Sequence, residues 1–232
     1  MEALRSFARR VKHVGLYCIG REVLYSRDVR CAYEVVGNED ANFAVCPDLL
    51  KSDSVVYSFG IGTDISFDLE LMRRFGVTVH AFDPTPRSLA WVRTQNLPSH
   101  FHVHEYGVAD RDGTIEFAPP ASDAHVSHTV VAGRGQGQTI SAPVKRIATI
   151  MQELGHRSIG LLKMDVEGAE YGVIRDLVAE AIPVGQLCIE FHHRWPEVGA
   201  AQTRQAINAL HAAGYRIFHV SDKGEEYSFL GK

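Results

Sequence analysis

Short apolar runs alternate with amphipathic stretches along most of the chain from residue 55 onwards. The run at 55–59 is rich in β-prone residues, and the apolar side chains between 65 and 75 recur at helical spacing. The same pattern predicts strands at 55–59, 77–82, 101–106, 159–164 and 186–191, and helices at 65–75, 86–95, 147–154, 169–179 and 200–213. Strands and helices in this order predict an α/β fold with a mostly parallel sheet and right-handed crossovers.

The two ends of the chain depart from this alternation. Apolar runs at 215–220 and 227–230 flank a turn signal at 222–224, which predicts a terminal antiparallel hairpin. At the other end, the pattern at 4–11 predicts an amphipathic helix with a basic face, which we expect to cap the main domain rather than bind a membrane. We therefore expect an N-terminal extension, residues 1–50, that packs on a main domain at 51–232.

Two segments have no regular pattern. Residues 14–50 mix short apolar runs with Gly, Asn and Asp, and no structure is predicted there. Residues 111–145 contain a β-prone stretch at 114–117, a pair of prolines and a glycine-rich run. We expect strands and a flexible segment in 111–145, lying over the sheet edge or the mouth of a site.

Composition restricts the class of protein. The 232 residues are 45% hydrophobic and 22% charged, as in globular domains and unlike disordered or coiled-coil chains. A net charge of −4 argues against nucleic acid or a membrane as the main partner. The four cysteines form no C-x-x-C pair, so no structural zinc site is expected. A charged start and the lack of a long apolar stretch predict a soluble, cytoplasmic protein, and homo-oligomerisation is left open.

A Gly-x-Gly turn, Gly60 to Gly62, follows the first predicted strand and precedes a helix. Such a turn lets backbone amides approach a nucleotide, although a tight turn without a ligand needs the same glycines. Asp83 ends the next strand, 21 residues after Gly62, where an acid can accept the ribose hydroxyls. The alternative is that Asp83 only fixes the turn that follows. A pyrophosphate-binding turn has the pattern G-x-G-x-x-G, but here Ile65 stands at the position of the last glycine. The Asp64 carboxylate before it would repel a pyrophosphate, so the turn disfavours a dinucleotide.

Two later strands end in groups that can move a proton. Asp165 follows the strand at 159–164, and Glu190 and His192 close the next one. We expect all three at the carboxyl edge of the sheet, where open α/β folds bind ligands. His192 is the preferred general base, with Glu190 or Asp165 holding its ring. The same three groups could ligate Mg²⁺ or Mn²⁺, but a metal-free base is favoured.

The charged residues around these three groups could have purely structural roles. Asp165 could cap the helix that follows it, and Glu170 sits where a carboxylate favours a helix N-terminus. Lys163 is expected to pair with a carboxylate, and His193 to be exposed.

Three motifs together resemble the FkbM-type S-adenosylmethionine-dependent methyltransferases. They are Tyr57-Ser58-Phe59-Gly60-Ile61-Gly62, Ala81-Phe82-Asp83-Pro84-Thr85-Pro86 and Leu162-Lys163-Met164-Asp165-Val166-Glu167-Gly168-Ala169-Glu170. The resemblance covers residues 50–192 and implies a class I, Rossmann-like methyltransferase fold, α/β with seven strands in the order 3-2-1-4-5-7-6. It also implies an S-adenosylmethionine donor and transfer to a hydroxyl oxygen. The residues it assigns to the donor are Ser58, Gly60, Gly62, Asp64, Asp83, Tyr106 and Asp165.

The first motif departs from the family pattern. Many members have Asp-Val-Gly-Ala-Asn-x-Gly, whereas here Ser58 replaces the Asp, Gly62 the Asn and Asp64 the last Gly. We therefore expect the methionine end of the donor to be held differently. The acceptor is expected to be a hydroxylated small molecule or a glycan. A nicotinamide-dependent dehydrogenase or epimerase and a non-catalytic nucleotide-binding protein are the alternative functions.

Overall fold

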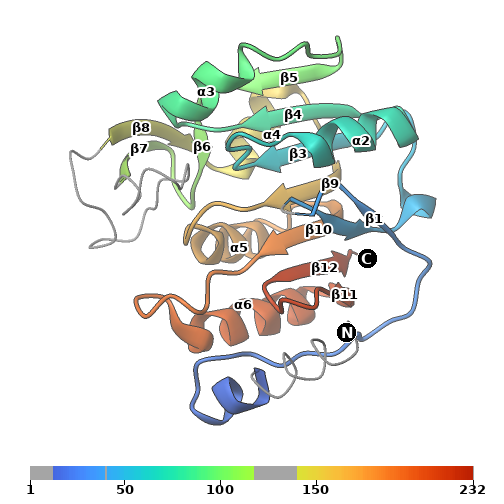
Figure 1. The fold of residues 1–232 in the computed structure, drawn as a ribbon. Coiled ribbons are helices and arrows are strands. Elements are labelled where there is room, and N and C mark those ends of the chain that lie inside the picture. The colour runs from blue at the N-terminus through green and yellow to red at the C-terminus, as the bar shows by residue number, and fades with distance from the viewer. Residues whose placement is uncertain (1–12, 40, 118–139, 232) are drawn as a thin grey trace.

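Seven strands form the central sheet of the computed structural model, which describes residues 13–39, 41–117 and 140–231 (Figure 1). Their order is β11 (Arg216–Val220), β12 (Glu226–Leu230), β10 (Val184–Glu190), β9 (Ile159–Met164), β3 (Val55–Phe59), β4 (Thr78–Phe82) and β5 (Phe101–His104). Neighbours from β10 to β5 run parallel, whereas β12 is antiparallel to both β10 and β11. Counted along the chain this is 3-2-1-4-5-7-6, so the expected fold, with its terminal hairpin, is confirmed.

Helices cover both faces of the sheet. One apolar cluster joins the sheet to α4 (Ile147–Leu154), α5 (Glu170–Ala179) and α6 (Gly199–Ala213), and a second joins it to α2 (Ser66–Phe75) and α3 (Pro86–Val92). The apolar stripes that predict these helices are the sides that face the sheet. Helices α2 and α4 end where expected, at Gly76 and Gly155, whose backbones are left-handed.

One helix is shorter than its pattern predicts. The sequence predicts a helix to residue 95, but α3 ends at Val92. The next amides, of Thr94 and Gln95, donate to the carbonyls of Trp91 and Val92, three residues back. The chain therefore tightens into a turn there, an ending that apolar spacing does not reveal.

The N-terminal segment adds a small hairpin that the sequence did not predict. Strands β1 (Glu34–Val36) and β2 (Phe43–Val45) pair antiparallel, and the 3-10 helix η1 (Pro47–Leu49) follows. Figure 1 shows the hairpin on the same face of the central sheet as α2. The Gln186 side chain holds Cys46 by accepting from its N–H at 2.7 Å and donating to its carbonyl at 3.0 Å. Three-residue strands are too short for an alternating pattern to show. The helix expected at 4–11 lies outside the described residues.

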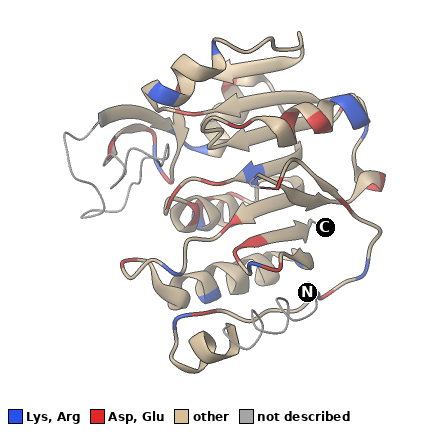
Figure 2. Ribbon diagram, viewed as in Figure 1, with Lys and Arg blue, Asp and Glu red and all other residues tan. Residues whose placement is uncertain are grey.

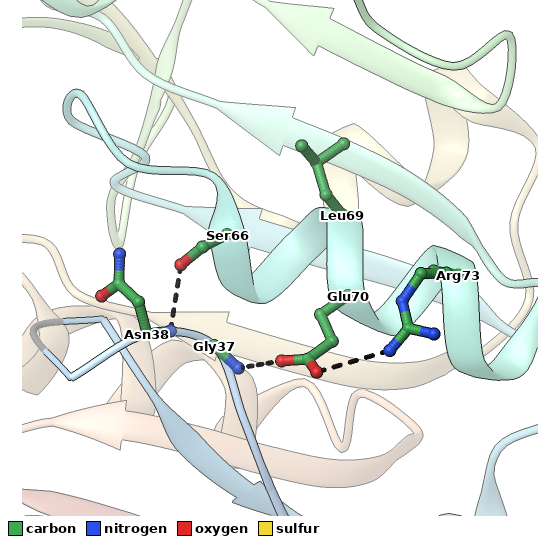
Figure 3. Close-up of a pocket in the computed structure, with 6 residues that line it drawn as sticks. All are labelled: Gly37, Asn38, Ser66, Leu69, Glu70 and Arg73. Carbon is green, nitrogen blue, oxygen red and sulfur yellow. Dashed lines mark hydrogen bonds and ion pairs between the residues drawn. The ribbon is translucent and has the colours of Figure 1, made fainter.

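A pocket lies between this hairpin and α2 (Figure 3). The Gly37 N–H donates to Glu70 Oε2 at 2.7 Å, and the Asn38 N–H donates to Ser66 Oγ at 3.1 Å. The lining residues are Gly37, Asn38, Ser66, Leu69, Glu70 and Arg73. These bonds fasten the hairpin to the helix that directly follows the glycine turn.

A second, three-stranded sheet occupies part of the irregular segment. It consists of β6 (Gly107–Val108), β8 (Ile140–Lys145) and β7 (Gly113–Phe117), in that order. Strand β6 runs parallel to β8, and β7 runs antiparallel to it. The strands expected between 111 and 145 are therefore present, while the flexible segment expected there falls largely on residues 118–139, outside the described part.

Charged residues of both signs are spread over the elements seen in Figure 2 rather than separated between them. Within the described residues, no helix has the length and apolar character needed to cross a membrane.

Candidate active site

The glycine turn brings the ends of β3 and β9 together. Gly60 has φ +76°, and a Cβ there would lie 1.7 Å from the backbone oxygen of Asp165. Only glycine fits this position. Gly62 also has φ +52°, but a Cβ on it would meet nothing within 4 Å. The turn therefore packs against Asp165 on one side and leaves open space at Gly62.

Asp83, at the end of β4, holds this turn. Its Oδ2 accepts from the amides of Ile61 at 3.2 Å and Gly62 at 3.0 Å. Its Oδ1 accepts from the amide and hydroxyl of Thr85, at 2.8 and 2.6 Å. Both carboxylate oxygens therefore hold the chain around the turn, and a ribose contact stays a prediction.

The other residues assigned to the donor lie around the turn. Ser58 is fully buried in β3 beneath it. Asp64 accepts from the Ser66 N–H at 2.8 Å and from the Asn38 side chain, so it helps to start α2. Tyr106 is half-buried, and its ring packs on Phe82 and under the Lys145 ammonium, 4.5 Å from the ring centre. Their donor contacts stay predictions.

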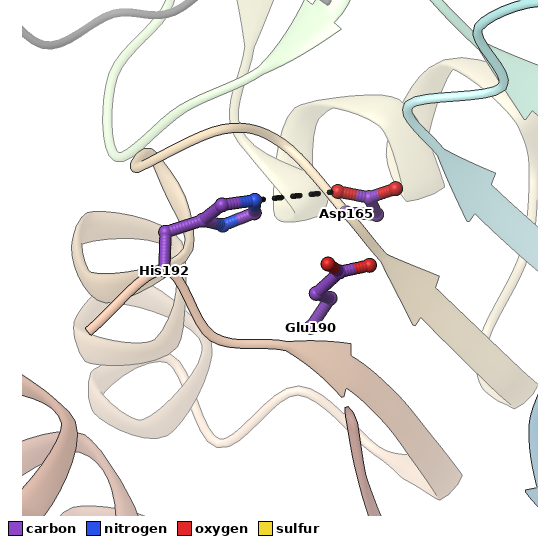
Figure 4. Close-up of side chains that lie close together, drawn as sticks. All are labelled: Asp165, Glu190 and His192. Atoms are coloured by element: carbon purple, nitrogen blue, oxygen red, sulfur yellow. Dashed lines mark ion pairs between the residues drawn. The ribbon is translucent and has the colours of Figure 1, made fainter. Parts of the chain in front are cut away.

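Asp165, Glu190 and His192 meet at the carboxyl ends of β9 and β10 (Figure 4). One oxygen or nitrogen from each lies within 4.8 Å of the others, and His192 Nε2 is 3.8 Å from Asp165 Oδ1. Lys163 links this cluster to the glycine turn, because its Nζ donates to the Gly60 carbonyl at 2.5 Å and lies 3.8 Å from Asp165 Oδ2. The structure therefore brings the three proposed catalytic residues together beside the turn.

The carboxylate that holds His192 is Glu170, rather than the expected Glu190 or Asp165. Glu170 is fully buried, and its Oε1 accepts from His192 Nδ1 at 3.0 Å and from the His192 N–H at 3.1 Å. Its Oε2 accepts from the Gly168 N–H at 2.8 Å. Nδ1 therefore carries a proton, and Nε2 faces Asp165 and, at 3.3 Å, Glu167.

Glu167 and Gly168 make the bend that allows this arrangement. Their φ values are +51° and +100°, and a left-handed glutamate is rare. The chain makes a sharp turn at these two residues. It sends the chain from β9 into α5 so that Glu170 lies behind His192.

The charges of the cluster change its proton affinities. Burial alone would lower the pKa of His192, but the Glu170 hydrogen bond and the Asp165 and Glu167 carboxylates raise it to about 10. Burial, reinforced by the Asp165 carboxylate, raises the pKa of Glu190 to about 8. Without a ligand, His192 is therefore protonated at neutral pH, whereas a base must be neutral.

His193 is buried, contrary to the expectation that it would be exposed. It is 1% exposed, and its Nε2 bonds to Glu22, a fully buried carboxylate of the N-terminal segment. Glu22 also accepts from Arg194 Nη2 at 2.8 Å and bonds to His13 Nδ1 at 3.0 Å. The N-terminal segment is thus tied to the loop that carries His192, a contact between residues too distant in sequence for any local pattern to predict.

The family model described as "Methyltransferase FkbM domain" matches residues 33–217. The chain belongs to the FkbM methyltransferase family. Its methyl donor is therefore S-adenosylmethionine, which counts against the nicotinamide-dependent alternative.

Three relatives show how far the similarity extends. Probable methyltransferase-like protein 24 of Rattus norvegicus is 28% identical over 83% of this chain and 50% of its own length. The 2-O-methyltransferase NoeI of Sinorhizobium fredii (strain NBRC 101917 / NGR234) is 30% identical over 54% of this chain and 58% of its own length. The 31-O-demethyl-FK506 methyltransferase FkbM of Streptomyces tacrolimicus is 26% identical over 62% and 67%. The chain thus spans about half the length of the first relative.

The residues at this site fit an S-adenosylmethionine donor. Its sulfonium and ammonium groups are cationic, and Asp165, Glu167 and Glu190 supply anionic or polar oxygens at the edge of the sheet beside the turn. The open space at Gly62 leaves room for a ligand against the backbone. The same oxygen and nitrogen set is also of the kind that holds Mg²⁺ or Mn²⁺, and a metal there stays an unfavoured prediction.

Proposed function

We propose that this protein is an O-methyltransferase that acts on a hydroxyl group of a small molecule or sugar. The observation that carries the proposal is the convergence of Asp165, Glu190 and His192 beside the glycine turn. An alcohol must lose its proton as its oxygen attacks, so its methylation benefits from a base at this place. The names of two relatives, a 2-O-methyltransferase and a 31-O-demethyl-FK506 methyltransferase, also support oxygen as the accepting atom.

The bound donor supplies an electrophilic methyl carbon, and the chain aligns the acceptor and takes its proton. In the proposed mechanism the acceptor hydroxyl donates to His192 Nε2, which removes the proton during attack. Glu170, bonded to Nδ1, stabilises the imidazolium that forms. Asp165, 3.8 Å from Nε2, accepts from the acceptor or keeps the ring in place.

His192 must first lose the proton it carries in the free protein. The pKa values of His192 and Glu190, raised to about 10 and about 8, both fall when a positive charge lies beside them. A cationic donor in the site therefore favours the neutral imidazole. This links donor binding to the activation of the base, with the released proton going to solvent.

The test is a product screen with S-adenosylmethionine labelled with ¹³C in the methyl group, against a panel of sugars and other hydroxylated acceptors. We expect a labelled methyl ether, recognised by its carbon shift, and far less of it in the same time from the His192→Ala variant. Label on nitrogen or carbon would contradict O-methylation. Donor binding without transfer to any acceptor in the panel would favour the non-catalytic alternative.

A further inference from the structure

A row of buried polar side chains crosses the sheet beneath the glycine turn. Ser58 of β3 is paired in register with Lys163 of β9, and Lys163 with Cys188 of β10. This row lies on the face covered by α2 and the N-terminal hairpin, and Lys163 is only 8% exposed. An ammonium group at such a depth requires a counter-charge or hydrogen bonds.

Asp68, in the first turn of α2, faces this row. It is 2% exposed, and its Oδ1 has no hydrogen-bond partner among the described residues. The Ser58 hydroxyl oxygen has no partner of good geometry there either. Burial raises the pKa of Asp68 to about 6, while Lys163 and Ser58 oppose the shift, so all three groups interact. A buried carboxylate with an open acceptor position thus lies near the Lys163 ammonium.

Lys163 is the group through which Asp68 can act on the donor site. Its Nζ donates to the carbonyls of Gly60, at 2.5 Å, and Phe59, at 3.4 Å. The same nitrogen lies 3.8 Å from Asp165 Oδ2. Asp165 is the carboxylate within ion-pair distance of Lys163, and without the charge of Asp68 its attraction for the ammonium would be unopposed. The lysine would then be drawn from the turn towards a carboxylate that the donor site uses.

We propose that Asp68 is a positioning residue for donor binding. Its negative charge balances the Lys163 ammonium from the side of α2, so that the lysine keeps its hydrogen bond to the Gly60 carbonyl in the glycine turn. In this role Asp68 replaces the aspartate that many FkbM proteins have at the position of Ser58. Both positions border the same buried ammonium, one from the strand and one from the helix. The family motif therefore departs at Ser58 without loss of the carboxylate, which α2 supplies instead. The inference rests on donor binding and is independent of the accepting atom.

Relocating the carboxylate tests this idea. Calorimetry with S-adenosylhomocysteine compares wild type, Asp68→Asn, Ser58→Asp and the double variant Ser58→Asp/Asp68→Asn. We expect Asp68→Asn to weaken binding about tenfold, because the buried Lys163 ammonium loses a negative charge that balances it. Ser58→Asp alone should also weaken binding, because two buried carboxylates then repel each other. The double variant should return to within about threefold of wild type. Asp53→Asn, at an exposed position, is the matched control and should bind normally.

Two results would overturn the inference. One is normal binding by Asp68→Asn, and the other is a double variant that binds no better than Asp68→Asn. Thermal melting accompanies each measurement. If Asp68→Asn does not fold, a folded and binding double variant supports the proposal, and an unfolded or non-binding one refutes it. A wild-type protein that does not bind S-adenosylhomocysteine is a separate result, which would contradict the assigned donor.

Discussion

Replacing Glu170 with glutamine tests the electrostatic basis of the site most sharply. Glu170 is fully buried, and one of its oxygens accepts both from His192 Nδ1 at 3.0 Å and from the His192 backbone at 3.1 Å. Glutamine keeps the shape and one acceptor oxygen but removes the charge. Hydrogen bonds to charged groups contribute about 1.5–3 kcal/mol, and one pKa unit corresponds to about 1.4 kcal/mol. The pKa of His192 should therefore fall from about 10 by about one to two units.

The assay is an NMR titration of the histidine ring nitrogens in ¹⁵N-labelled protein, with His192→Ala identifying the resonance. Glu153→Gln, which removes an exposed carboxylate paired with Lys145, is the matched control and should leave the His192 titration unchanged. An unchanged pKa of His192 in the Glu170→Gln variant would refute the assignment of Glu170 as its partner.

The same substitution changes how stability depends on pH. The pKa of His192 is higher in the folded protein than in the unfolded chain. Its contribution to stability is therefore complete below about pH 6.5 and is lost as the pH rises towards about 10. Denaturant unfolding at pH 6 and pH 9 should show a smaller loss of stability in Glu170→Gln than in wild type. An equal loss in both proteins would mean that Glu170 does not raise the pKa of His192.

Three further predictions concern other parts of the molecule. Asp83→Ala should weaken S-adenosylhomocysteine binding by about 2–3 kcal/mol in calorimetry, because the glycine turn loses its acceptor and the ribose its charged partner; unchanged affinity would reduce Asp83 to a local turn residue. Methyl transfer should continue in EDTA, and loss of activity restored by Mg²⁺ or Mn²⁺ would instead assign a metal to Asp165, Glu190 and His192. Burial and neighbouring histidines lower the pKa of His80 to about 3, so stability should fall between about pH 6.5 and pH 3; His80→Phe should reduce that fall in denaturant unfolding at pH 7 and pH 5, and an unchanged fall would show that His80 is not its source.

The central sheet could be predicted from sequence because each of its parallel strands is a short apolar run between helices. The runs at 55–59 and 159–164 became β3 and β9 without a change of bounds. The hairpin of β1 and β2 could not be predicted, because it has three residues in each strand and is held by Gln186 from the other half of the chain. Its position depends on tertiary contacts rather than on a local pattern.

The candidate site could also be predicted only in part. The carboxyl ends of neighbouring strands indicated Asp165, Glu190 and His192, since parallel strands end at one edge. Glu170 and Glu22 were not assigned their roles, because a glutamate near a helix start or in an irregular segment is ordinarily solvated. Only the folded chain shows that both are fully buried and bonded to consecutive histidines. The raised pKa of His192 likewise depends on carboxylates gathered by the bend at Glu167.

The central claim is that His192 removes the acceptor proton in an S-adenosylmethionine-dependent methyl transfer to oxygen. Its most direct test is kcat of wild type and His192→Ala with labelled donor and an acceptor from the product screen. The account predicts a loss of about 10²–10⁴-fold in kcat, with S-adenosylhomocysteine affinity near that of wild type. It also predicts that kcat/KM of wild type rises with pH through a limb above the ordinary histidine range, which the variant lacks. A variant with near-normal kcat and the same pH profile would contradict it.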